Sequence, residues 1–198
     1  MDAPSGVLNL VDVCWLKAEI GPTRRGYLLQ ARVKLHVPKN LVRLNRGELD
    51  DIDAVDLRIA AGRKFTDFLD NGLGLLIASQ RAVDVFSNEK LTGWRTYPIA
   101  LFDKNDRLLK EKYYIIGITG RAGPLDKEKS VKDWFTEKDG TQRWLRLKGL
   151  LFDPKTWDGS DFFVLQDYGA VLVNGKVLDV LKQAKLTGWE AISVKKWF

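Results

Sequence analysis

The chain of 198 residues contains a single cysteine, Cys14, and a single histidine, His36. One cysteine excludes an internal disulfide, and one residue of each type cannot supply the three or four Cys and His ligands of a zinc site. His36 lies between Leu35 and Val37, which is typical of a strand, whereas nucleophilic catalysis would need a Cys, Ser or Thr beside it in space. We therefore expect no metal, no cofactor and no histidine-based catalytic centre.

Long apolar runs are also missing. No segment approaches the roughly 20 apolar residues that a membrane-spanning helix needs, and the opening sequence MDAPSG lacks the basic region of a secretory signal peptide. We expect a cytoplasmic protein without membrane contact. The remaining composition, 45% hydrophobic and 29% charged residues, is that of an ordinary globular protein.

Charge of one sign is only mildly in excess. The net charge is +6, and the basic residues are scattered among acidic ones; the densest basic segment contributes Lys34, Lys39, Arg43 and Arg46. Such an excess can attract an acidic partner or nucleic acid, and it can also be a solvated face. A nucleic-acid-binding module is therefore one alternative, although a nucleic-acid partner is not our first expectation.

The most informative feature that is present is an internal repeat. Residues 74–94 align without a gap on residues 169–189, and both segments end in Leu-Thr-Gly-Trp. Each copy opens with an apolar run typical of a buried strand and continues with the apolar spacing of an amphipathic helix. We predict two similar strand-helix-strand units, within residues 65–101 and 161–198, which indicate an internal duplication.

The residues that agree between the copies are explained by folding. Ser79 and Asn174 precede the two helices and can accept a hydrogen bond from a first-turn amide. The other matched positions are predicted to form ion pairs three residues apart on the exposed helix face, to place a cation in the last turn, and to supply a left-handed helix exit. These positions are Arg81 with Asp84, Lys176 with Asp179, Lys90 and Lys185, and Gly93 and Gly188.

Strand patterns outnumber helix patterns and alternate loosely with them, so we predict an α+β fold with a mixed, mostly antiparallel sheet. Residues 1–63 form an N-terminal β-rich segment with strands near 7–16 and 27–37, and residues 64–198 form the domain that contains both repeat units, in one compact body. Residues 97–102 and 112–119 flank a turn typical of a hairpin. In the second copy the chain ends where that hairpin would begin.

Glycine-rich segments do not form a nucleotide loop, because Gly72 and Gly74 lack a third glycine and no Walker pattern occurs. Residues 117–123 leave a strand and include Arg121, so their amides and guanidinium could face an anion. The alternative is a tight strand exit with an exposed arginine. An enzyme that uses a carboxylate and Arg121 is the catalytic hypothesis that this loop leaves open.

Tryptophan is abundant, with seven residues, and three of them lie in or beside the irregular charged segments after residue 120. Because Trp and Arg dominate the energetics of protein interfaces, we expect this part of the molecule to bind a partner. The alternative is that the rings pack these segments onto the sheet. The candidate partner-binding residues are Arg121, Trp134, Phe135, Trp144 and Trp157.

Several segments together resemble a known family. In order, they are residues 74–79, 91–94, 97–99, 113–116, 119–124 and 161–163, followed by the final repeat. Their order and spacing resemble the eleventh immunity family of bacterial polymorphic toxin systems, whose members are small cytoplasmic proteins encoded beside secreted toxins. The resemblance extends from residue 65 to the C-terminus and is loose over residues 1–62.

This resemblance implies a protein that binds and neutralises a cognate toxin and has no catalytic residues to carry over. Immunity proteins that block nucleases are often acidic, and the net charge of this chain is +6, which makes a nuclease a less suitable target. We therefore predict a toxin-binding protein that is not an enzyme. A twofold homodimer is a further expectation, because such dimers are the commonest oligomers.

Overall fold

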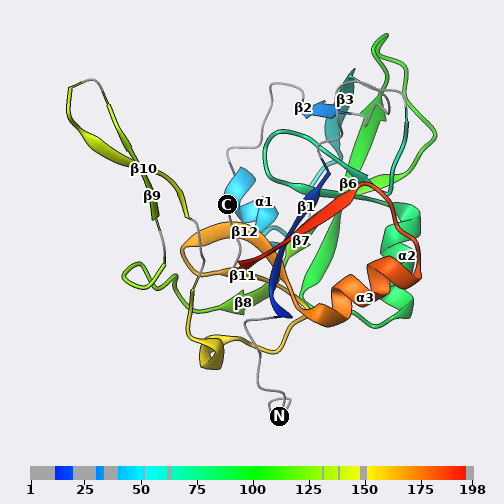
Figure 1. Ribbon diagram of the computed structural model, residues 1–198. Coiled ribbons are helices and arrows are strands. Elements are labelled where there is room, and N and C mark those ends of the chain that lie inside the picture. Colours follow the sequence, from blue (N-terminus) through cyan, green and yellow to red (C-terminus); the bar gives the residue numbers. More distant parts are fainter. Residues whose placement is uncertain are drawn as a thin grey trace.

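The computed structural model describes residues 12–19, 30–33, 40–50, 52–61, 64–130, 132–137, 139–147 and 151–194. These residues form an α+β fold, as predicted, with the helices α1 (Leu41–Asn45), α2 (Gln80–Asn88) and α3 (Gly175–Gln183). Most strand pairs are antiparallel; β3 with β6 and β8 with β11 are parallel. The strands are distributed over three sheets (Figure 1).

The six-stranded sheet has the order β2-β3-β6-β7-β5-β4. Its strands, in that order, are Gln30–Val33, Val55–Ala61, Trp94–Phe102, Tyr113–Ile118, Leu76–Ser79 and Phe68–Leu69. The five-stranded sheet has the order β13-β1-β12-β11-β8. Its strands are Trp189–Ser193, Cys14–Ala18, Tyr168–Val173, Phe162–Leu165 and Gly120–Ala122. A separate hairpin pairs β9 (Lys132–Thr136) with β10 (Gln142–Leu147).

Each predicted repeat unit has the expected strand-helix-strand order, β5-α2-β6 in the first and β12-α3-β13 in the second. Figure 1 shows α2 and α3 side by side at one edge of the body. The predicted caps are confirmed, because Ser79 Oγ accepts from Ala82 N at 3.2 Å and Asn174 Oδ1 accepts from Val177 N at 3.2 Å. The two units therefore begin their helices in the same way, while the internal duplication itself stays a prediction.

The N-terminal strand β1 completes the second unit. It lies between β13 and β12, and it is antiparallel to both, just as β7 lies between β6 and β5 in the first unit. The amide that follows each strand makes an equivalent bond: Glu19 N donates to Gly188 O at 2.9 Å, and Thr119 N donates to Gly93 O at 2.8 Å. The second copy therefore needs no hairpin after β13, because a strand from the other end of the chain fills that place.

A buried carboxylate in the second unit binds the Leu-Thr-Gly-Trp turn of the first. Asp161, 5% exposed, accepts from Thr92 N at 2.8 Å and from Thr92 Oγ1 at 3.1 Å. Within its own unit it accepts from Asn174 Nδ2 at 3.0 Å, and Lys176 Nζ lies 3.3 Å away. One carboxylate thus joins the capping residue of α3 to the turn after α2.

The reciprocal contact joins the first unit to the second. Asp67, 7% exposed, accepts from Thr187 N at 2.8 Å and from Thr187 Oγ1 at 3.0 Å. It also accepts from Ser79 Oγ at 3.0 Å and from Arg81 Nη1 at 2.9 Å. Because charged hydrogen bonds in a protected site are stronger than neutral ones, these two clusters hold the units face to face.

The central core lies between the units. It contains side chains from both sheets and both helices, including Leu16, Ile116, Phe86, Phe162 and Leu181, all nearly inaccessible to solvent. A second cluster covers the outer face of the six-stranded sheet beneath α1, and a third covers the outer face of the five-stranded sheet. The six-stranded and five-stranded sheets are therefore each buried on two faces, and their inner faces share one core.

Two sequence predictions about the helices are wrong in detail. Arg81 and Lys176 bond to Asp67 and Asp161 rather than to the acidic residues three positions ahead, Asp84 and Asp179. The buried carboxylates are shielded from solvent, so water screens their attraction for the cations less than it would for an exposed partner on the same helix.

The left-handed exit residues are also displaced. Lys90 and Lys185 both have φ of 51°, so they lie beyond the last turn, where each helix ends with the hydrogen bonds of a Schellman motif. Gly93 and Gly188 have positive φ as expected, at 84° and 80°, but they lie three residues further on, against the opposite unit.

The N-terminal predictions are met in part. The strands β1 and β2 overlap the expected ones at 7–16 and 27–37; residues 7–11, 27–29 and 34–37, with His36, lie outside the described residues. In the portion of the chain that the structure describes, no helix is long and apolar enough to cross a membrane.

Replacing either buried carboxylate tests the reciprocal contacts. We expect Asp161→Ala and Asp67→Ala each to lower the free energy of unfolding by about 2–4 kcal/mol, because several buried donors lose their acceptor. Asp84→Ala, which removes an exposed acid on α2, should change it by less than about 0.5 kcal/mol. Urea unfolding followed by circular dichroism measures all three, and equal effects would contradict the assignment.

The close approach of the two units gives a second test. A Cβ at Gly93 would lie 2.0 Å from Phe162 O, whereas one at Gly140, whose φ is the same 84°, would meet nothing within 4 Å. Gly140→Ala should therefore cost only the left-handed strain, about 1 kcal/mol, and Gly93→Ala at least about 2 kcal/mol more. Thermal or urea unfolding of the two variants measures the difference, and similar losses would show that Gly93 is not sterically constrained.

Candidate partner-binding surface

Three of the predicted partner-binding residues lie on the β9–β10 hairpin, which projects from the body (Figure 1). The register places Trp134 opposite Trp144 and Phe135 opposite Arg143, with an irregularity between Trp144 and Arg146. The turn is closed by Glu137 N donating to Thr141 O at 2.9 Å and Gly140 N donating to Glu137 O at 3.0 Å. The hairpin therefore brings the three aromatic residues to neighbouring positions on one two-stranded ribbon.

The base of the hairpin is fixed to the body. Asp126 N donates to Leu151 O at 2.8 Å, and Leu151 N donates to Ser130 Oγ at 3.1 Å. Ser130 is 4% exposed, and Leu125, also buried, donates its amide to Asp167 Oδ1 at 2.8 Å. These bonds tie the two chain segments at the hairpin base to each other and to the turn after β11.

Trp157 lies on the body of the protein. It follows the 3-10 turn η2 (Pro154–Thr156), and its Nε1 donates to Ser160 O at 2.9 Å. Its ring lies 6.1 Å from the ring of Phe163 and joins the outer cluster of the five-stranded sheet while remaining half-buried. The ring thus packs this turn onto the sheet and leaves part of its surface accessible.

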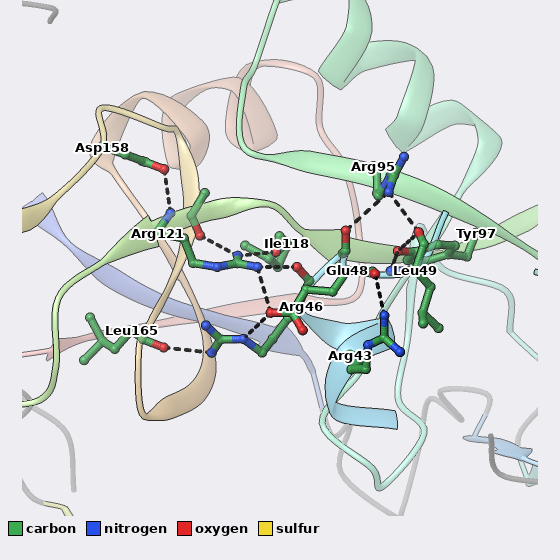
Figure 2. Close-up of polar contacts among 12 residues, drawn as sticks. Arg43, Arg46, Glu48, Leu49, Arg95, Tyr97, Ile118, Arg121, Asp158 and Leu165 are labelled. Atoms are coloured by element: carbon green, nitrogen blue, oxygen red, sulfur yellow. Dashed lines mark hydrogen bonds and ion pairs between the residues drawn. The ribbon is translucent and has the colours of Figure 1, made fainter. Parts of the chain in front are cut away.

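Arg121 connects the exit of β7 to the segment after α1 through its guanidinium group (Figure 2). Nη1 donates to Ile118 O at 2.7 Å and Gly120 O at 3.0 Å, and Nη2 donates to Arg46 O at 2.6 Å. Glu48 Oε1 lies 3.3 Å from Nη2. Burial, followed by the nearby Arg46, lowers the pKa of Arg121 from its usual value. Its donors therefore serve mainly to hold the segment after α1, and one third of the side chain stays exposed.

Other arginines in Figure 2 hold the same segment, residues 46–50. Arg46 Nε donates to Glu48 at 2.8 Å and its Nη1 donates to Leu165 O at 3.0 Å. Arg95 Nη1 and Tyr97 Oη donate to Leu49 O at 2.8 and 2.7 Å. The hydrogen bond from Arg46 is the main reason why the pKa of Glu48 is lowered. Much of the basic excess here is therefore directed at acceptors within the protein.

The loop at 117–123 is a tight strand exit, which was the alternative to an anion site. The amides of residues 119 and 120 donate to Gly93 O, the amide of Arg121 donates to Asp158 Oδ2 at 2.7 Å, and that of Gly123 donates to Thr156 Oγ1 at 2.8 Å. These amides point to acceptors inside the protein, so the loop does not present them together to a ligand.

Titratable side chains do not gather into a metal-type site among the residues with described structure, where no group of three or more His, Cys, Asp or Glu could hold an ion. Cys14 lies half-buried in β1, and burial raises the pKa of its thiol above the usual value. A raised thiol pKa disfavours the thiolate, so Cys14 lacks the activation of a nucleophile.

A groove that sequence reasoning missed lies between β1 and the turn before β5. We call it the β1 groove: it has a volume of about 220 Å³, and its lining comprises residues 15–18, 70–72 and 74–76. Trp15 and Lys17 form its wall on the strand, with Lys17 Nζ 5.0 Å from the Trp15 ring centroid. No local pattern could have revealed it, because its two walls come from segments far apart in the sequence.

The described residues form an α+β protein with a projecting β9–β10 ribbon and the open β1 groove. The chain matches the Immunity protein family (Imm11) over residues 20–196 and belongs to that family. The match includes much of the segment 1–62, over which the resemblance read from the sequence is loose. No curated protein matches the chain.

The role of Arg121 can be tested by replacement. A lysine is a point donor that cannot reach three carbonyl oxygens in a fork, so we expect Arg121→Lys to lower the free energy of unfolding by about 1–3 kcal/mol. Lys155→Ala, on the exposed face of η2, is the control and should change it by less than about 0.5 kcal/mol. Urea unfolding measures both changes. If Arg121→Lys has the same free energy of unfolding as the unaltered chain, the guanidinium has no structural role.

Proposed function

We propose that this protein is an immunity protein that binds and neutralises a cognate bacterial toxin by protein–protein contact, in the cytoplasm and without catalysing a reaction. Membership of the immunity family is the observation that carries this proposal. Neutralisation by direct contact requires a toxin partner and a surface of this protein that the toxin can reach. The geometry offers two such surfaces, the β9–β10 hairpin and the β1 groove.

The hairpin is the better candidate for the main contact. A two-stranded ribbon on its own is marginally stable in water, and burial against a partner would compensate for the missing layer. The register brings Trp134, Phe135 and Trp144 to adjacent positions on it. Because a few Trp, Tyr and Arg residues usually supply most of an interface's binding energy, this aromatic group is the proposed anchor.

Arg121 and Trp157 are the remaining candidate contacts, and they lie outside the hairpin. They lie together at the β8 edge of the five-stranded sheet, where Asp158 N donates to Arg121 O at 3.0 Å. Each is partly exposed and held by bonds to the protein, so neither loses much side-chain freedom when a partner binds. We propose that they form the rim of the toxin contact.

Binding to the toxin gives the direct test. The candidate toxin is to be sought among the genes beside the one that encodes this protein, and co-expression of the two should restore growth of cells that make the toxin. We expect Trp134→Ala and Trp144→Ala each to weaken binding at least about 10-fold, a loss of about 1.4 kcal/mol, measured by isothermal titration calorimetry. Lys104→Ala, in the exposed turn between β6 and β7, should bind the toxin like the unaltered chain.

Folded variants decide the outcome. If Trp134→Ala and Trp144→Ala keep the native circular dichroism spectrum and full toxin affinity, the hairpin is not the contact. If the unaltered chain neither binds the toxin nor restores growth, the immunity proposal itself fails.

The purified protein also allows tests of the alternative function and of the expected oligomeric state. The nucleic-acid alternative predicts binding of DNA or RNA near about 50 mM salt that weakens steeply as salt rises; absence of binding there would eliminate it. Light scattering of the purified chain measures whether it forms the expected twofold homodimer.

A further inference from the structure

The β1 groove has a counterpart that the protein itself fills. The two units correspond in the order of their strands: β1 takes the place of β7, and the longer turn before β5 takes the place of the turn between β11 and β12. The groove between β1 and residues 70–76 therefore corresponds to the space between β7 and residues 165–170. The end of α1 lies in that second space, where Asn45 bonds to Gly169 and Arg46 bonds to Leu165; Figure 2 shows the contact of Arg46 with Leu165.

Three contacts seat α1 in its space. Its backbone lies directly on β7, because a Cβ added to Gly117 would lie 2.8 Å from Leu44 O and 2.9 Å from Gly47 Cα. Asn45 Nδ2 donates to Gly169 O at 2.9 Å, and Arg46 Nη1 donates to Leu165 O at 3.0 Å. The occupant is thus a short helical turn whose amide and guanidinium side chains donate to the carbonyl groups of the facing turn.

The β1 groove repeats this setting with two differences. Lys17 stands at the position that corresponds to Gly117, opposite Glu190 as Gly117 is opposite Arg95. Its charge is offset by Glu190, whose Oε2 lies 3.1 Å from Lys17 Nζ. The Lys17 side chain lines the same wall as Trp15, so an occupant would lie further out than α1 does, beside the Trp15 ring.

The facing turn also suits a basic occupant. Asp70 adds a carboxylate to the lining, and Gly72 and Gly74, both with positive φ, turn the backbone at the rim. Leu73, between these glycines, is 42% exposed and offers an apolar contact beside the polar one. The turn itself is rigid, because buried Asn71 bonds both to Leu75 O at 2.6 Å and to the amide of Leu73 at 3.0 Å.

We propose that the β1 groove receives a short helical turn of the toxin that carries an arginine or asparagine, in the place that corresponds to α1 but held off the strand by Trp15 and Lys17. The inference rests on the proposed function and specifies a second contact point of the same partner. The side chains of that turn donate to the backbone carbonyls of residues 71–74 and to Asp70. Its apolar side packs on Trp15 and Leu73.

A charge reversal with a matched control tests this contact. Asp70→Arg places a cation where the proposed basic side chain sits, and it should weaken toxin binding at least about 10-fold by calorimetry. Asp84→Arg makes the same charge change on the exposed face of α2, away from the groove, and should leave the affinity within about twofold. Leu73→Asp, at an exposed position between the lining residues Gly72 and Gly74, is the second variant in case Asp70→Arg fails to fold, and it too should weaken binding.

Hydrogen exchange of the unaltered complex gives an independent readout. The amides of residues 70–76 should be protected when the toxin binds, while those of the turn at 103–107 should not. Full affinity in the folded groove variants, with no protection at 70–76, would overturn the inference and leave the proposed function intact. Absence of any toxin binding by the unaltered chain would overturn both. A homodimer that Asp70→Arg dissociates would place a second copy of this chain in the groove and also overturn it.

Discussion

Two buried carboxylates, Asp67 and Asp161, hold the protein together by each reaching from one unit to the threonine turn of the other. Each accepts hydrogen bonds from a backbone amide and a hydroxyl across the interface and is neutralised by a cation of its own unit. A buried charge is stable only when such partners are all present, so the clusters fix the relative position of the units. The backbone hydrogen bonds beside them, from residues 68 and 162 to the opposite turn, follow from that position.

The surfaces suited to binding depend on this arrangement. Because the inner faces of the two larger sheets share one core and two further clusters bury their outer faces, the sheet edges and the projecting hairpin are left for other contacts. On one side α1, Arg46 and Arg121 fill the space between β7 and the turn after β11. On the other side the corresponding space is the open β1 groove. The similar strand order of the two units thus explains where the β1 groove lies. It also makes the space beside β7, which α1 fills, a guide to the chemistry of an occupant.

The two units differ most in one segment, which lies between β8 and β11. The segment between β8 and β11 has no counterpart in the first unit among the described residues, and it contains the β9–β10 hairpin and η2. The hairpin brings Trp134 and Trp144 into register, while the base bonds through Ser130 and Leu151 fix it to the body. A rigid shared core with a distinct projecting element is consistent with a protein that recognises one partner by shape and a few anchors.

Local sequence determined the units: the strand-helix-strand order, the caps at Ser79 and Asn174 and the α+β class follow from hydrophobic spacing and capping chemistry that act over a few residues. The resemblance in the order of short segments also indicated the immunity family. Only the tertiary structure decided that Arg81 binds Asp67 rather than Asp84, that β1 completes the second unit and that a groove opens beside it. These features join residues distant in the chain, and burial, which sets the strength of such contacts, exists only once the two units have come together.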